Sequence, residues 1–218
     1  INGTTAAGFE PVQQLFEKQM HTLAEENAQL CIYHRGQTVV DLWYSKADDP
    51  NFKPNSLVNV FSSGKSLEAI AIASLVGKGL LSYETRVEDV WPEYRGGGKE
   101  NTRVADVMRH EAGLANFDTA IDVDDLLPEN IKANRLGNII EKQEQHFRSP
   151  EVGRREYHAM TRGWIVNEVF RRADPAGRTI GEYLAEEVSG PLAADVMIGL
   201  NENQLQRASK ITPLDIRR

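Results

Sequence analysis

The sequence contains one cysteine, Cys31, among its 218 residues. A single cysteine cannot form a disulfide within the chain, so a reducing compartment is allowed. The first residues, INGTTAAGFEP, also lack the basic residues and the apolar run of a secretory signal. These two absences favour an intracellular location, either cytoplasmic or mitochondrial.

Long apolar runs and an excess of basic residues are lacking as well. No stretch approaches the ~18 uncharged apolar residues that a membrane-spanning helix requires, so we expect no membrane span. The 25 lysine and arginine residues are outnumbered by 32 aspartate and glutamate residues, which gives a net charge of −7. Nucleic-acid-binding domains carry clustered basic residues instead, so we expect no nucleic-acid partner.

What the chain does contain is typical of a globular α+β domain, with 40% hydrophobic and 26% charged residues. Its hydrophobic periodicity predicts that helices dominate. Strands are expected at residues 30–34 and 38–43, with a turn at 35–37 and a strand or extended entry at 58–61. Helices are expected at residues 9–26, 65–78, 104–109, 131–143, 160–172 and 179–188, with an irregular segment at 121–130, an extended one at 191–200 and a weak helix at 201–211.

The predicted sheet is small for the helix that it has to cover. Residues 65–78 are apolar almost all round, which predicts a central, buried helix. Two or three strands bury such a helix poorly. We therefore expect the complete sheet to have further strands, and this chain to be the N-terminal portion of a longer protein.

The stretch VNVFSSGKSLEAIAIASLVGKGLLS contains the pattern S-x-x-K at Ser62 and Lys65, just before this helix. Residues three apart on a helix share a face, so the hydroxyl and the amine come within reach of each other. Serine is a weak nucleophile unless a neighbouring base takes its proton. Burial and the positive end of a helix lower the pKa of a lysine toward that role. The pattern therefore predicts a nucleophile and its base.

The same serines also have a purely structural interpretation. Serine is a favoured N-cap, and S-x-x-K is short enough to occur by chance. If Ser62 or Ser63 only caps the helix, Ser62→Ala would lower stability by ~1 kcal/mol and change nothing else. The position before the most apolar helix favours the nucleophile.

Several later segments follow this stretch in a characteristic order. They read GLLSYETRVEDVWPEY, VADVMRHEAGL, REYHAMTRGWIVNEVFRR and SGPLAADVMIGL, and the hairpin YHRGQTVVDLWYS precedes them all. Together they resemble the serine β-lactamase-like superfamily, which includes class C β-lactamases, family VIII carboxylesterases and D-amino peptidases. The sequence of these segments is most similar to the esterase-like branch, and the resemblance covers nearly the whole chain.

The resemblance implies a β-lactamase/transpeptidase-like fold that is incomplete here. The N-terminal helix, the β-hairpin of the sheet and the mainly helical region are present, and the C-terminal strands are absent. It implies a single domain over residues 1–218. The helix and sheet part occupies residues 1–62, and the nucleophile helix and helical region occupy residues 63–218.

The resemblance also implies roles for individual residues. Ser62 is the acylated nucleophile and Lys65 accepts its proton. Tyr157 matches the tyrosine of the second motif, Y-x-N or Y-H-x, and moves protons together with Lys65. A phenol with a pKa of ~10 does so near neutral pH only if cations stabilise the phenolate. His158 is expected to contribute to substrate binding, with an exposed or capping role as the alternative.

Two features depart from the pattern of the superfamily. Ala159 stands where Y-x-N has an amide, which favours ester, amide or peptide substrates over efficient β-lactam hydrolysis. The third motif, K-T-G, H-x-G or W-x-G, belongs to a strand beyond Arg218. We expect a serine hydrolase that acts through an acyl-enzyme on a small-molecule substrate, esterase-like and related to penicillin-binding proteins. The alternative is a non-catalytic homologue that binds or assembles with a partner, and a homo-oligomer is left open.

Neither a metal nor another cofactor is expected. His110 and Glu111 lack the second histidine of H-E-x-x-H. We expect His110 to hold a loop behind the site. The other histidines and the acidic run show no metal-ligand spacing; these residues are His21, His34, His146, Asp122, Asp124 and Asp125.

Overall fold

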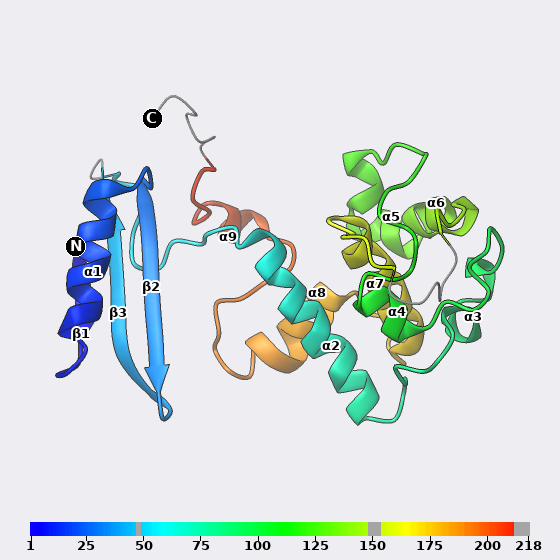
Figure 1. Cartoon of the computed structure of the whole chain (residues 1–218), viewed down its shortest axis with the longest axis horizontal. Helices are drawn as coiled ribbons and strands as arrows, with labels where there is room; N and C mark the ends of the chain where they lie inside the picture. Colours follow the sequence, from blue (N-terminus) through cyan, green and yellow to red (C-terminus); the bar gives the residue numbers. More distant parts are fainter. Residues whose placement is uncertain (47–48, 148–153, 212–218) are drawn as a thin grey trace. The chain divides into compact units, whose positions relative to one another are not determined.

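The computed structural model describes residues 1–46, 49–147 and 154–211 (Figure 1). Within these residues the chain forms two units. One consists of Ile1–Asn59 and the described part of Leu200–Arg218, and the other consists of Val60–Gly199. The C-terminal described segment therefore belongs with the N-terminal part of the chain, whereas the expected division grouped it with the helical region.

The first unit contains a three-stranded antiparallel sheet (Figure 1). Its strands lie in the order β1 (Asn2–Thr5), β3 (Gln37–Ser45), β2 (Asn27–His34). Arg35 and Gly36 have φ angles of 52° and 78°, the positive values that a two-residue hairpin turn requires. The predicted hairpin is confirmed. Strand β1 was not predicted, because its four residues have no apolar side chain that could alternate with polar ones, and only pairing with β3 makes them a strand.

Helix α1 (Glu10–Thr22) covers one face of this sheet. Phe16 and Met20 lie one turn apart and are buried in a cluster with Val40 of β3. The helix was expected to continue to residue 26. It ends earlier because Leu23 adopts an extended backbone and the next residues lead into β2.

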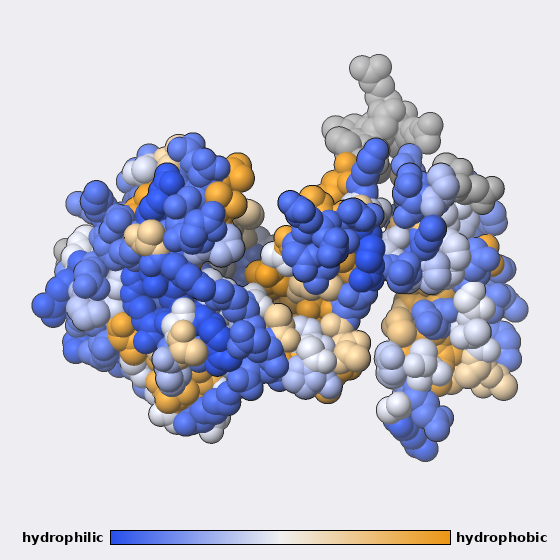
Figure 2. Space-filling model, turned by 180° about the vertical axis from the view of Figure 1, so that it is seen from behind, coloured by the Kyte–Doolittle hydropathy of each residue, from blue (hydrophilic) through white to orange (hydrophobic). Residues whose placement is uncertain are grey.

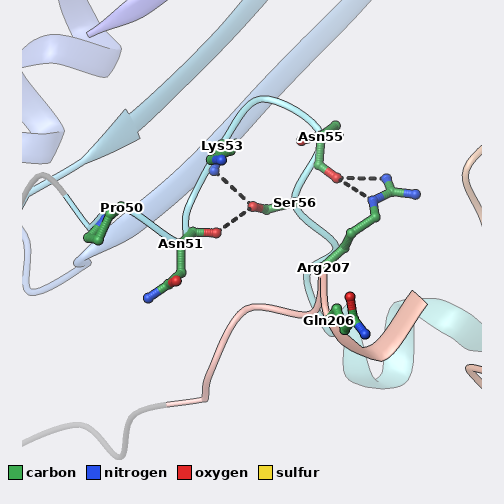
Figure 3. Close-up of a pocket in the computed structure, with 7 residues that line it drawn as sticks. All are labelled: Pro50, Asn51, Lys53, Asn55, Ser56, Gln206 and Arg207. Carbon is green, nitrogen blue, oxygen red and sulfur yellow. Dashed lines mark hydrogen bonds between the residues drawn. The ribbon is translucent and has the colours of Figure 1, made fainter. Parts of the chain in front are cut away.

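The C-terminal described segment completes the first unit. Leu57 and Ala208 form a parallel β-bridge. The guanidinium of Arg207 donates to the carbonyl oxygen of Asn55 at 3.0 Å and 2.6 Å, which ties together residues 152 apart in the sequence. A pocket of about 260 Å³ forms at this junction (Figure 3). The weak helix expected here is a short one, α9 (Glu202–Leu205).

The second unit is helical and is built around α2 (Lys65–Gly77) and α7 (Thr161–Ala173) (Figure 1). These helices bury one large apolar cluster that includes Leu75, Ile165 and Phe170. The other helical segments are α3 (Val87–Val90), η2 (Pro92–Tyr94), α4 (Val104–Met108), η3 (Val123–Leu126), α5 (Pro128–Lys132), α6 (Arg135–Lys142), α8 (Ile180–Leu184) and the π-helical η4 (Ala185–Ser189).

Helix α2 is buried on one side and not all round. Ala71, Ile72 and Leu75 are fully buried, whereas Ile70 is 48% exposed. The prediction of a central helix was therefore wrong for one face. Apolar composition alone does not reveal which face a helix buries when nearly every position is apolar.

Other differences arise where the chain turns. Residues 58–61 were expected to be a strand or an extended entry, but the described residues 58–60 form no strand and Phe61 already begins η1 (Phe61–Gly64), a 3₁₀ turn. The segment at 121–130 is not irregular, since it contains η3 and the start of α5. Asn134, with φ of 63°, separates α5 from α6, so the helix expected from residue 131 begins only at residue 135.

The surface is mainly hydrophilic on the face drawn in Figure 2, with apolar patches on both units. Exposed apolar side chains of the second unit include Val60, Phe61 and Met160. Among the described helices, none combines the length and the apolar character needed to cross a bilayer. The α+β class predicted from the sequence is confirmed.

Candidate active site

Ser62 lies in η1, which runs directly into α2. Phe61 before it has φ of 46°, a left-handed backbone that costs a bulky residue roughly 1–2 kcal/mol. The starts of η1 and α2 both lie within the described residues, and at neither of them does a side chain cap the backbone. The interpretation of Ser62 or Ser63 as an N-cap is therefore wrong. The Ser62 hydroxyl contacts Lys65 and Tyr157 instead.

Lys65 is the first residue of α2, and its ammonium group connects two segments of the chain. The Nζ atom donates to Ser62 Oγ at 3.2 Å and to the carbonyl oxygen of Ala159 at 2.7 Å. It also lies 5.0 Å from the centre of the Tyr157 ring, within cation–π range. The structure thus brings together the three residues to which the sequence analysis assigned chemistry.

Tyr157 completes this cluster from the segment before α7. Its hydroxyl oxygen lies 2.5 Å from Ser62 Oγ, close enough for a proton to pass between the two oxygens. The pKa of Tyr157 is lowered, first by the hydrogen bond with Ser62, then by the hydrogen bond and charge of Lys65, and further by the charge of Arg162. The side chain is exposed, so this tyrosine is not part of the core.

Two histidines, His110 and His158, hold the segment that contains Tyr157 in place. His110 adopts φ of 65°, its ring lies 4.9 Å from the Tyr157 ring, and its Nδ1 accepts the N–H of His158 at 3.0 Å. Burial is the main cause that lowers the pKa of His110 to about 4, so this ring is neutral near pH 7. His110 therefore joins the loop after α4 to the Tyr157 segment, as the loop-holding role predicts.

His158 was expected to contribute to substrate binding, and its alternative of an exposed histidine is wrong because the residue is fully buried. Its Nε2 accepts the N–H of Leu114 at 2.9 Å, and its Nδ1 donates to the carbonyl oxygen of Glu156 at 2.5 Å. Burial lowers the pKa of His158 as well. Because both ring nitrogens bind backbone groups, this geometry gives His158 a structural place beside the site and does not support a substrate contact.

The sequence analysis missed two charged residues next to this cluster. Glu68 follows Lys65 by one helical turn on α2, and Arg162 is the second residue of α7. Their side chains form an ion pair with an Nη1–Oε2 distance of 2.6 Å. A signal was present for Glu68, since it is the one acidic residue of the apolar helix α2.

A second serine–lysine–tyrosine contact lies at the other end of α2. The Ser74 hydroxyl hydrogen-bonds to the Tyr183 hydroxyl, and Lys78 Nζ donates to the same oxygen at 3.1 Å. Tyr183 is 2% exposed, whereas Tyr157 is 56% exposed. The second contact therefore joins α2 to α8 inside the unit, and of the two clusters only that of Ser62 is open to a substrate. Among the described residues, no three His, Cys, Asp or Glu side chains are grouped as metal ligands.

Comparison with known proteins assigns the chain to a family. The profile of the family described as Beta-lactamase matches residues 12–213. The esterase/beta-lactamase LipL of Mycobacterium tuberculosis (strain ATCC 25618 / H37Rv) is 34% identical over 169 residues, which cover 76% of this chain and 37% of that protein.

Solved structures show the same relationship. A family VIII carboxylesterase is 28% identical, with a TM-score of 0.86 over 98% of this chain and 57% of that protein. A penicillin-binding protein homologue from Caulobacter crescentus is 30% identical, with a TM-score of 0.85 over 97% of this chain and 56% of that protein. The chain thus has a β-lactamase/transpeptidase-like fold in partial form, and it spans little more than a third of the curated relative and just over half of these structures. It belongs to the beta-lactamase family.

Proposed function

We propose that the protein is a serine hydrolase that forms an acyl-enzyme on Ser62, with esters as its preferred substrates. The observation that carries this proposal is the contact of one exposed hydroxyl with two proton carriers. Ser62 Oγ lies 3.2 Å from Lys65 Nζ and 2.5 Å from the Tyr157 hydroxyl. A serine becomes a nucleophile when a neighbouring group takes its proton, and both candidates are in place.

The reaction proceeds in two balanced steps. In the first, Ser62 Oγ bonds to the carbonyl carbon of the ester, and its proton passes through the Tyr157 phenolate to the departing alcohol as the C–O bond breaks. In the second, water attacks the acyl carbon, the bond from that carbon to Ser62 Oγ breaks, the water proton passes through Tyr157 to Ser62 Oγ, and the acid is released. Lys65 stabilises the phenolate, which agrees with the lowered pKa of Tyr157. The positive end of the helical segment that begins at η1 favours the negative charge of the tetrahedral intermediate.

Esters are the substrates that the site supports best. Ala159 contributes its carbonyl oxygen, which binds Lys65, and a methyl side chain in place of an amide. A β-lactam or peptide with an acylamido group therefore finds no side-chain amide at this position. The relatives named as an esterase/beta-lactamase and a family VIII carboxylesterase are consistent with this preference.

Covalent labelling tests the proposal. The protein is incubated with a fluorophosphonate, and the modified peptide is identified by mass spectrometry, beside the variants Ser62→Ala and Ser74→Ala. Ser74 is a matched control because it also contacts a tyrosine and lies on α2, the helix that directly follows the segment of Ser62. We expect one adduct on the Ser62 peptide, present in Ser74→Ala and absent in Ser62→Ala.

Two results would contradict the proposal. An adduct that persists in Ser62→Ala would place the nucleophile elsewhere. A folded protein without any adduct would favour the alternative of a non-catalytic homologue. Because the chain spans only part of its relatives, the labelling is run on the 218 residues and on any longer natural protein that contains them.

A further inference from the structure

A buried ion pair lies one helical turn beyond Lys65. Glu68 follows Lys65 by three residues on α2, and Arg162 follows Tyr157 by five residues, at the start of α7. The Glu68 and Arg162 side chains are 14% and 5% exposed. The pair therefore connects the helix that carries Lys65 to the helix that follows Tyr157, and so links the two segments that form the candidate site.

The sequence provides a specific place for the Glu68 carboxylate. A Cβ atom at Gly163 would lie 2.7 Å from Glu68 Oε1, so a larger residue would require the carboxylate to shift. Glycine within a helix costs about 1 kcal/mol relative to alanine. A glycine in the first turn of α7 leaves room for the carboxylate in the position where it pairs with Arg162.

The hydrogen-bond donors of the buried Arg162 guanidinium are only partly satisfied. Its Nη2 is 3.8 Å from the Met108 sulfur, a weak acceptor. Its Nε is buried and has no hydrogen-bond partner in the described part of the chain. Buried ion pairs are often replaced by apolar residues at no cost in stability. Stability alone therefore does not explain a buried arginine here, and part of its charge is left to act on its neighbours.

Tyr157 is the neighbour for which this charge has a chemical consequence. Ser62 and Lys65 contact Tyr157 from η1 and α2, His110 lies against it from the loop after α4, and Arg162 acts on it from α7. His110 adds no charge near pH 7, because its pKa is about 4. Lys65 and Arg162 are therefore the two cations that favour the Tyr157 phenolate.

We propose that the Glu68–Arg162 ion pair positions Lys65 and Tyr157 relative to each other for the acylation of Ser62. The proposal rests on the hydrolase function proposed above. Arg162 supplies a second cation to the tyrosine, and Glu68 fixes that cation and offsets part of its charge. The two members of the pair therefore act on Tyr157 with opposite sign.

The opposite signs make the test specific. Tyr157 is titrated by NMR of ¹³Cζ-labelled tyrosine in the full chain, with its signal identified by its loss in Tyr157→Phe. We expect Arg162→Met to raise the pKa of Tyr157 and Glu68→Gln to lower it. Arg162→Lys keeps the charge and should leave the titration close to that of the wild type. Acylation of Ser62 by a p-nitrophenyl ester at pH 7 should fall roughly tenfold in Arg162→Met, equivalent to about 1.4 kcal/mol.

Two further variants keep the test decisive. Asp174→Asn breaks another buried ion pair, in which Arg178 lies 2.9 Å away, and it should lower Tm without moving the Tyr157 titration. The double variant Glu68→Gln/Arg162→Met removes both charges, so it should fold even if a single variant does not. We expect it to acylate slowly while remaining folded.

The proposal is overturned if Arg162→Met and Glu68→Gln change Tm but leave both the Tyr157 titration and the acylation rate of folded protein unchanged. Shifts of the same sign in both variants would also overturn it, because a general loosening of the site would produce them. The NMR readout needs no turnover. An inert Ser62 with the expected opposite shifts would therefore refute the hydrolase function alone.

Discussion

At the scale of single residues, the proposed chemistry depends most on Tyr157. Its ring is exposed and its hydroxyl lies 2.5 Å from Ser62 Oγ, so the group combines access to solvent with contact to the proposed nucleophile. The pKa of this phenol is lowered chiefly through its hydrogen bond with Ser62. A lowered pKa means that the phenolate, the form able to accept the serine proton, becomes populated at lower pH than in free tyrosine.

We predict that Tyr157→Phe lowers the acylation rate by roughly 10²–10⁴-fold, the usual contribution of a general base. The wild-type rate should rise with pH as Tyr157 ionises, at pH values below the ordinary pKa of 10.0, and the variant should lack this rise. Stopped-flow release of p-nitrophenol across the pH range measures both effects. A variant with the wild-type rate and pH profile would remove Tyr157 from the mechanism.

At the scale of elements, the N-terminal end of α2 contributes to the candidate site, and one face of the same helix contributes to the core. Lys65 begins the helix at the site, while Leu75 is fully buried further along. Ile70 lies on the same helix and is 48% exposed. The two apolar residues therefore provide a matched pair for separating stability from chemistry.

We expect Leu75→Ala to lower the free energy of unfolding by about 2–5 kcal/mol, because it leaves a cavity in the core. Ile70→Ala should change the same free energy by less than about 0.5 kcal/mol. Urea denaturation of the two variants measures the difference. Equal losses would show that both faces of α2 are buried in solution, as the sequence analysis had assumed.

The elements also show what sequence patterns can and cannot predict. The hairpin and the helices α2, α4 and α7 were predictable because alternation or helical periodicity repeats along them. Strand β1 was not, since its pairing is set by a distant partner. The break at Asn134 was missed because a single left-handed residue leaves the apolar spacing on both sides intact.

At the scale of the whole molecule, the half-buried His110 and the buried His158 make stability depend on pH. The pKa of His110 falls from 6.5 to about 4 on folding, and that of the fully buried His158 also falls. Between these pH values the unfolded chain binds protons that the folded chain does not. The stability that comes from these neutral rings is therefore fully present above about pH 6.5 and is lost as the pH falls toward 4.

We predict that His110→Asn loses less stability than the wild type between pH 7 and about pH 4.5. Asparagine tolerates the left-handed backbone of this position, φ 65°, and its side-chain oxygen can accept the His158 N–H. Denaturant melts at the two pH values measure the effect, with the exposed His21→Asn as control. A loss equal to that of the wild type would assign the acid sensitivity to other groups.

The whole site was only partly predictable from the sequence. Ser62, Lys65 and Tyr157 were found because the family resemblance marks each of them. The Glu68–Arg162 pair was missed because the residues lie 94 positions apart in the sequence and meet only when α2 packs on α7. The bond of His158 with the backbone of Leu114 was missed for the same reason, since these residues lie 44 positions apart.

The central claim is that Ser62 becomes acylated during ester hydrolysis. The most direct measurement combines the pre-steady-state release of p-nitrophenol from an activated ester with the mass of the rapidly quenched protein. We predict a stoichiometric burst of p-nitrophenol, a mass increase equal to one acyl group, and location of that group on the Ser62 peptide. A folded protein that shows neither a burst nor an acyl group on Ser62 would contradict the account.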